Sequence, residues 1–194
     1  MASELRRAVM FTIVSMALVG AYHVVLWGIG RAAFPDQAAG SLVLRGDGTV
    51  VGSTLIAQKF TQPAYFQPRP SAVDYNAAST GGTNYGPSNP DHLKAVQERL
   101  DAVMTQEHVA AGRVPSEMVT ASGAGLDPHL PPAAADIQAP RVASARGVPV
   151  DRVRALMAEH TELPAMGVFG RPRVNVLELN LALDETLPAV SGTR

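Results

Sequence analysis

The sequence predicts a single N-terminal transmembrane helix followed by a mixed α/β (α+β) extracytoplasmic domain. Three observations predict this class. Residues 8–30 contain no Lys, Arg, Asp or Glu. All 15 prolines and 14 of the 17 glycines follow that run, which indicates many short elements and turns. The same portion carries both the 3.6-residue period of helices and the two-residue period of strands.

The apolar run of residues 8–30 is long enough to cross a bilayer. As a helix rising about 1.5 Å per residue it spans about 34 Å, against about 30 Å of hydrocarbon. It is apolar on every face, which argues against a helix buried in a soluble core. Gly30-Arg31-Ala32 resembles a weak cleavage site, so a secretory signal peptide is the alternative.

Basic residues beside the run predict its orientation. Arg6 and Arg7 precede the run, whereas Arg31 alone follows it closely. The positive-inside rule then places residues 1–7 in the cytoplasm. Residues 31–194 would form a periplasmic domain attached to a bacterial inner membrane by one span.

The beginning of the domain predicts a hairpin and then a long loop. Two short apolar runs, 42–44 and 49–51, flank the turn-forming Gly46-Asp47-Gly48 within residues 41–60. Residues 61–90 contain five prolines and almost no helix signal. Loops of this length are often functional, so we expect residues 61–90 to be more than a connection.

The clearest soluble helix begins at Asn89. Asn89 is suited to cap it, Pro90 to occupy the first helical position, and an apolar stripe extends from Leu93 to Met104. We expect this helix to end before Gly112.

Two further helices are predicted. One covers about 132–146, where Pro140 should kink or split it and Gly147 should end it. The other opens at Pro149 and has apolar positions from Val150 to Met157 on one face.

The last regular segment shows a two-residue period. Val174 and Val176 alternate with polar residues, and the leucines from Leu177 to Leu183 continue in the other phase. This slip predicts a strand with a bulge, or a strand followed by a turn.

Composition excludes several functional classes. The chain has no cysteine, which excludes disulfides, thiolate metal sites and cysteine nucleophiles. Its formal net charge of −1 argues against nucleic acid as a partner. Neither Lys59 nor Lys94 lies in a phosphate-binding loop, the HExxH motif is missing, and the five histidines are scattered. We therefore expect no catalytic residue, no metal site and no cofactor of its own.

Two polar segments are candidates for a catalytic or nucleotide-binding site. Ser122, Asp127 and His129 lie close together and permit a hydrolase hypothesis, although a glycine-rich turn with Asp127 near the next helix start is the simpler interpretation. Residues 80–84 contain two glycines but have no accompanying lysine or following helix, which favours a structural turn over a nucleotide site. A stand-alone binding or chaperone domain is a further alternative.

The apolar run also offers a face for another helix. Ala17 and Ala21 form a small-x-x-x-small pair beside Gly20, which allows close helix approach. His23 is the only histidine in the run, and its place near Trp27 favours a neutral residue at the membrane interface.

Several sequence blocks follow the apolar run in a fixed order: 52–60 (GSTLIAQKF), 65–72 (YFQPRPSA), 75–76 (YN), 79–84 (STGGTN), 88–90 (SNP), 119–127 (VTASGAGLD), 141–146 (RVASAR) and 174–184 (VNVLELNLALD). Together with the apolar run, these blocks resemble the C subunit of the Kdp-type potassium-transporting ATPase. Departures are small: Ala57 stands where glycine is usual, and Thr80 and Thr83 where serine or glycine are common.

The resemblance implies a non-catalytic subunit of a potassium uptake complex. Its partners would be a channel-like potassium-binding subunit, a P-type ATPase catalytic subunit, a small membrane subunit and membrane lipid. The resemblance further implies a role in covering the outer mouth of the channel-like subunit, and in raising the affinity of the catalytic subunit for ATP. Asn84 and Asp127 are the candidate contact residues on the domain, beside Ala17, Gly20 and Ala21 on the helix.

Overall fold

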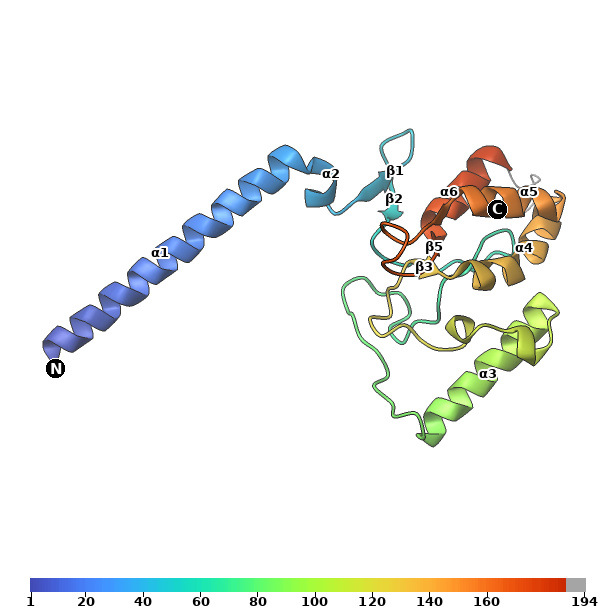
Figure 1. Cartoon of the computed structure of the whole chain (residues 1–194), viewed down its shortest axis with the longest axis horizontal. Coiled ribbons are helices and arrows are strands. Elements are labelled where there is room, and N and C mark those ends of the chain that lie inside the picture. Colours follow the sequence, from blue (N-terminus) through green and yellow to red (C-terminus); the bar gives the residue numbers. More distant parts are fainter. Residues whose placement is uncertain (188–194) are drawn as a thin grey trace. The chain divides into compact units, whose positions relative to one another are not determined.

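Figure 1 shows the computed structural model of the chain, which describes residues 1–187. The chain divides into two compact units, Met1–Leu42 and a second unit that begins at Val43. The last residues of the expected domain, 188–194, lie outside the described residues. The mixture of helices and short strands that the sequence predicts is confirmed.

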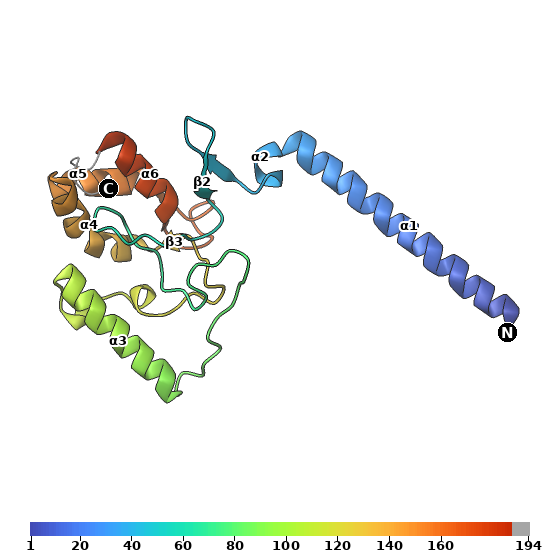
Figure 2. The ribbon, with the colours of Figure 1, turned by 180° about the vertical axis from the view of Figure 1, so that it is seen from behind.

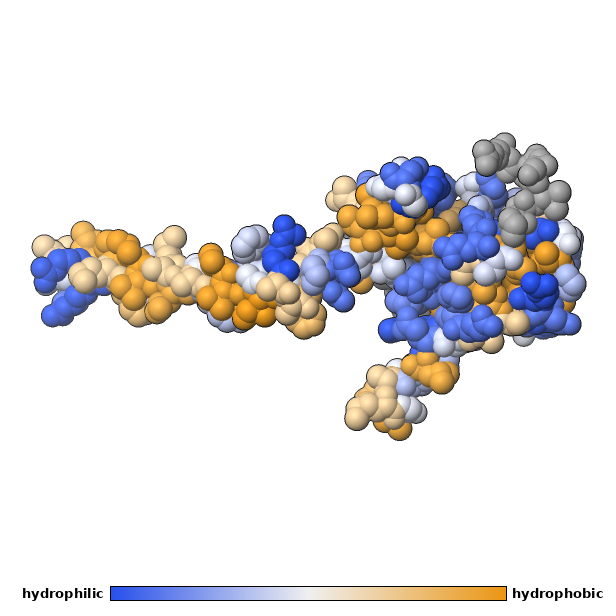
Figure 3. Space-filling view, turned by 90° about the horizontal axis from the view of Figure 1, so that it is seen from above, coloured by the Kyte–Doolittle hydropathy of each residue, from blue (hydrophilic) through white to orange (hydrophobic). Residues whose placement is uncertain are grey.

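The first unit consists of a long helix and one short turn of helix. Helix α1 covers Ala2–Ala33, and α2 covers Pro35–Ala38. None of the residues of α1 is buried, and apolar side chains cover most of the face of this helix that Figure 3 shows. By length and composition α1 is suited to cross a membrane, and it contains the whole predicted run.

The predicted hairpin is confirmed. Strand β1 (Leu42–Leu44) pairs with β2 (Val50–Ser53), and the two strands form a two-stranded sheet. In the turn, the backbone N–H of Gly48 donates to the carbonyl of Arg45 at 2.8 Å, and the Asp47 carboxylate accepts from the N–H of Thr49 at 2.9 Å. The aspartate thus closes the turn that its glycine neighbours make possible.

A long segment without helix or strand follows β2 and ends at α3 (Pro90–Glu107), as predicted (Figure 2). The Asn89 side chain caps α3 by accepting from the N–H groups of Asp91 and His92. The helix ends where His108 adopts a left-handed conformation, φ 55°. Two 3-10 turns, η1 (Ala111–Arg113) and η2 (Ser116–Met118), lead onward.

Three short strands form the only sheet of three strands in residues 1–187. Strand β5 (Arg173–Asn175) lies between β3 (His129–Leu130) and β4 (Thr161–Glu162), and both pairings are antiparallel. Asn175 lies opposite His129, and Val174 lies between Leu130 and Thr161. The central strand is therefore placed by β3, 44 to 46 positions away in sequence, and by β4, 11 to 13 positions away.

Helix α4 (Pro132–Arg146) is continuous, so of the two effects expected at Pro140, a kink or a split, the split is wrong. Pro140 is exposed, whereas its neighbours Ala139 and Val142 are fully buried, and their packing holds the helix across the one missing N–H. Gly147 ends the helix as predicted, with φ 65° and with the N–H of Val148 donating to the Ala143 carbonyl.

Helix α5 (Val150–Glu159) begins directly after Pro149 and buries the predicted face. The strand expected over 173–183 is corrected: it ends at Asn175, and α6 (Val176–Thr186) begins there. Asn175 causes this change, because its side-chain oxygen accepts from the N–H groups of Leu177 and Glu178 and starts a helix.

The sequence pattern does not predict helix α6, because the buried side of this helix is unusually wide. Its leucines alternate in sequence, as in a strand, yet positions on several faces of the helix are buried. The core is built mainly by α4, α5, α6 and β5, and it includes Phe66 from the long loop. Helices α4, α5 and α6 lie together in Figures 1 and 2.

Candidate functional site

The small residues of α1 form an open face. Ala17 and Ala21 lie one turn apart on the same side of the helix, with Gly20 between them. No atom lies within 4 Å of the position that a side chain on Gly20 would take. A second helix can therefore approach the backbone of α1 at this face more closely than elsewhere.

His23 is held by its own helix. Its Nδ1 lies 2.7 Å from the carbonyl of Val19, which can only accept, so Nδ1 carries the hydrogen. The ring also meets Tyr22 edge-on, with 5.7 Å between ring centroids. The structure thus gives His23 a hydrogen-bond partner within its own helix.

Two glycine-rich segments pack backbone to backbone, which explains residues 80–84. The N–H of Gly81 donates to the Ala124 carbonyl at 3.0 Å. A side chain on Gly82 would meet the carbonyl oxygen of Gly123 at 2.8 Å, so this position requires glycine. Asn84, in the left-handed region at φ 53°, is exposed, and its side-chain amide donates to the Gly82 carbonyl.

Asp127 lies at the point where the long loop meets β3. It is five positions before α4 rather than at the start of a helix. Its carboxylate accepts from Arg69 at 3.2 Å and from the backbone N–H of His129 at 3.1 Å. Among the described residues no hydrogen bond joins Ser122 to His129, and the backbone of Ser122 instead bonds to Pro70. The arrangement fixes loops and assembles no Ser-His dyad.

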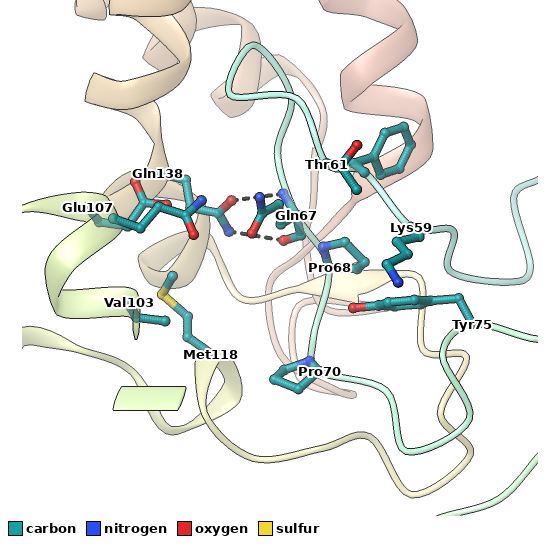
Figure 4. Close-up of a pocket in the computed structure, with 12 residues that line it drawn as sticks. Lys59, Thr61, Gln67, Pro68, Pro70, Tyr75, Val103, Glu107, Met118 and Gln138 are labelled. Carbon is teal, nitrogen blue, oxygen red and sulfur yellow. Dashed lines mark hydrogen bonds between the residues drawn. The ribbon is translucent and has the colours of Figure 1, made fainter. Parts of the chain in front are cut away.

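Two side-chain amides hold the long loop by its main chain. The Asn180 side chain accepts from the N–H of Phe66 at 2.8 Å and donates to the carbonyl of Phe66 at 2.9 Å. Gln138 does the same to Gln67, accepting at 2.8 Å and donating at 3.0 Å (Figure 4). Each amide replaces the neighbouring strand that this extended segment lacks.

Two arginines of α4 complete these contacts. Arg146 is fully buried, and it donates to the carbonyls of Ala64 and Leu187 and to the Asp184 carboxylate, all within 2.8 Å. Its guanidinium also stacks over the ring of Tyr65, 5.0 Å from the centroid. Because the charge is paired and its donors are used, burial of this arginine is tolerated.

Arg141 connects the same loop to α3. It donates to the carbonyls of Pro63 and Tyr65, to Gln138, and to the Glu107 carboxylate at 2.8 Å. The carboxylate is almost fully buried, and its Oε2 has no hydrogen-bond partner in the described part of the chain. Burial raises the pKa of Glu107 above its ordinary value, and the nearby Arg141 opposes this only in part.

Glu107 also borders two cavities. One, of about 420 Å³, is lined by Gln67, Tyr75 and Met118 among others (Figure 4). The other, of about 610 Å³, extends past Arg141 towards Arg154. The described residues contain no group of three His, Asp or Glu side chains that is suited to hold a metal.

Sequence reasoning missed this network. Arg141 and Arg146 fall in the block 141–146 and Asn180 in the block 174–184, whereas Glu107 and Gln138 lie outside every block. The one available signal was the presence of Gln138 and Asn180 as single polar residues between apolar neighbours. Buried polar residues at such positions usually have specific partners.

Comparisons with known proteins agree on one family. The family model described as KdpC, K+-transporting ATPase c chain, matches residues 5–185. A potassium-transporting ATPase KdpC subunit of Polaromonas naphthalenivorans is 50% identical over 192 residues, covering 97% of each chain. Those of Geobacter sulfurreducens and Variovorax paradoxus are 48% and 51% identical, over 95% and 93% of this chain and 99% and 95% of their own.

Proposed function

The chain belongs to the KdpC family of K+-transporting ATPase c chains, and on this premise we propose that it is a non-catalytic accessory subunit. It assembles and stabilises a high-affinity, ATP-driven potassium uptake complex. Its partners are a channel-like potassium-binding subunit, a P-type ATPase catalytic subunit and a small membrane subunit. In this proposal α1 crosses the bacterial inner membrane with the N-terminus in the cytoplasm, and the periplasmic domain covers the outer mouth of the channel-like subunit.

The observation that carries this proposal is the uncovered state of α1. None of its residues is buried within the chain, although the helix is apolar throughout. Lipid covers most of such a helix, and the narrow face of Ala17, Gly20 and Ala21 suits a partner helix. The internal network around Arg146 supports the same role, because it uses its polar groups to hold a loop rather than to expose reactive groups.

The domain contributes a second contact in this proposal. Asn84 is exposed within an ordered loop and is our candidate for direct contact. Asp127 contributes by positioning Arg69. We propose that any effect on the ATP affinity of the catalytic subunit is indirect, since a periplasmic domain does not reach a nucleotide on the cytoplasmic side.

A pair of helix substitutions tests the assembly role. In Ala21→Leu a bulky side chain fills the small-residue face, so the complex should co-purify less completely and cells should grow more slowly when potassium is limiting. Ser15→Leu is the matched control, because Ser15 lies about 200° around the helix from Ala17. Full assembly with Ala21→Leu, or isolation of the wild-type chain as a lone monomer from native membranes, would contradict the proposal.

A further inference from the structure

A hairpin of exposed apolar residues projects from the domain between β4 and β5. We call residues 163–170 the apolar finger. The N–H and carbonyl groups of Ala165 and Phe169 bond to each other at 2.9 Å in both directions. Met166 and Gly167 form the tip, both with positive φ, as the tight turn of a hairpin requires. The finger is therefore an ordered structure and its side chains are held outwards.

Four large apolar side chains are exposed within the eight residues of the finger. No charged residue occurs between Glu162 and Arg171. In Figure 3 the segment forms an orange and tan projection beside the domain. Exposed apolar patches of this kind mark sites of interaction. The most exposed members are Met166 at 91%, Leu163 at 77%, Val168 at 75% and Phe169 at 67%.

We propose that the apolar finger inserts into the lipid interface of the membrane that α1 is proposed to span. The first argument is reach. Helix α1 ends at Ala33 and the second compact unit begins at Val43. Even fully extended, this connection reaches at most about 36 Å, so the domain stays close to the bilayer surface.

The second argument is the chemistry of the finger. The N–H groups of Ala165, Gly167, Val168 and Phe169 donate to carbonyls within the finger, so entry into lipid leaves few backbone donors unpaired. The finger also presents Leu163 and Phe169, side chains of the kind that interfacial segments bury at the headgroup and acyl-chain boundary.

The third argument is charge at the base of the finger. Glu162 is paired with Arg173 at 2.8 Å, so its negative charge is offset. Arg171 is exposed at the base of the finger and adds a positive charge that suits anionic lipid headgroups. This inference rests on the proposed membrane anchor, but it assigns a surface that the proposed assembly role does not use.

The experiment uses the full chain in lipid nanodiscs that contain phosphatidylglycerol. Because the chain has no cysteine, Met166→Cys provides a unique site for a fluorescent probe. Lipids with brominated acyl chains should quench this probe at least twofold, and they should leave a probe at Ala102→Cys, on the exposed side of α3, unchanged. Equal and weak quenching at both sites would overturn the inference.

Three further variants separate the contributions of the membrane anchor, the apolar side chains and the charge of Arg171 to the quenching. Val19→Cys, within α1, should be strongly quenched, and failure there would contradict the anchor rather than the finger. Val168→Ser with Phe169→Ser should reduce the quenching at Met166→Cys, and Arg171→Gln should reduce it in anionic but not in zwitterionic nanodiscs. If the probe at Met166→Cys loses its quenching in the assembled complex, the finger contacts a protein subunit and the lipid proposal is wrong.

Discussion

Asn180 binds Phe66 as a neighbouring strand would, with one hydrogen bond to its N–H and one to its carbonyl, across 114 positions of sequence. Both residues are almost completely buried, so water does not replace these bonds when the amide is removed. The long loop is consequently anchored to α6 through the backbone of Phe66, beside the bond from the Tyr65 hydroxyl to the Asp184 carboxylate at 2.9 Å.

Asn180→Ala should destabilise the domain by about 2–4 kcal/mol. It leaves two buried backbone groups of Phe66 unpaired, at about 1–3 kcal/mol each. Urea unfolding of the full chain in detergent, followed by circular dichroism, measures the effect. Gln97→Ala on the exposed side of α3 is the control and should change stability by less than about 0.5 kcal/mol. Similar stabilities for both variants would show that the bonds to Phe66 contribute little.

Glu107 should make stability depend on pH. Its folded pKa is raised, so the folded state keeps its proton longer than the unfolded state does, and stability falls as pH rises from about 4.5 through the folded pKa. The glutamine side chain in Glu107→Gln stays neutral at every pH, so this variant lacks the fall in stability with rising pH. Its stability relative to the wild type should therefore increase between pH 4 and pH 7.

Unfolding of both proteins at these pH values checks the sign of the effect. Glu159→Gln, at an exposed position of α5, serves as the control and should follow the wild type at both pH values. A constant difference between Glu107→Gln and the wild type would mean that Arg141 fully offsets the burial of the carboxylate.

Gly82→Ala should cost about 1–3 kcal/mol, because the new methyl group would lie 2.8 Å from the carbonyl oxygen of Gly123. Gly86→Ala is the matched control, since nothing lies within 4 Å of its added methyl group. Thermal unfolding compares the two. If Gly82→Ala were as stable as Gly86→Ala, the two glycine segments would be more loosely packed than the structure shows.

The orientation of the chain is open to labelling in whole cells. With the outer barrier opened, an impermeant thiol reagent should modify Ala102→Cys and leave Ser3→Cys unmodified. The reason is the basic pair Arg6 and Arg7 on the cytoplasmic side of the proposed span. The reverse pattern would overturn both the orientation and the proposed position at the outer mouth.

The purified chain should neither hydrolyse ATP nor bind it. Calorimetry of the full chain in detergent with millimolar ATP should give no saturable heat. In the complex, an indirect effect should change ATP affinity by about 5- to 150-fold, and ATP should then tighten binding of this subunit by the same factor. Saturable binding to the isolated chain, abolished by one loop substitution, would indicate a direct nucleotide site.

Much of the fold could be predicted from local signals. Asn89, Gly147 and the turn at Asp47 act on their nearest neighbours, and the helix at 90, the end of α4 and the hairpin follow from them. The nature of α6 could not be predicted in this way, because its leucines alternate as in a strand and its buried side is wide enough to obscure the 3.6-residue period.

The network around the long loop was unpredictable for a different reason. Arg146, Gln138 and Asn180 bond to main-chain atoms that lie far away in sequence. Such bonds leave no pattern in the side chains of the segment that they hold. The sequence therefore predicts that 61–90 is a long loop and more than a connection, but it does not predict what holds this loop in place.

One consequence of this network concerns how the subunit can diverge. Arg141 and Arg146 bind the carbonyls of Pro63, Ala64 and Tyr65, and every residue type offers the same carbonyl. Gln62 and Pro63, which are exposed, can therefore be exchanged without loss of the bonds that hold the loop. Substitutions at Gln62 and Pro63 could therefore create contacts with a different partner protein while the bonds that hold the loop stay in place.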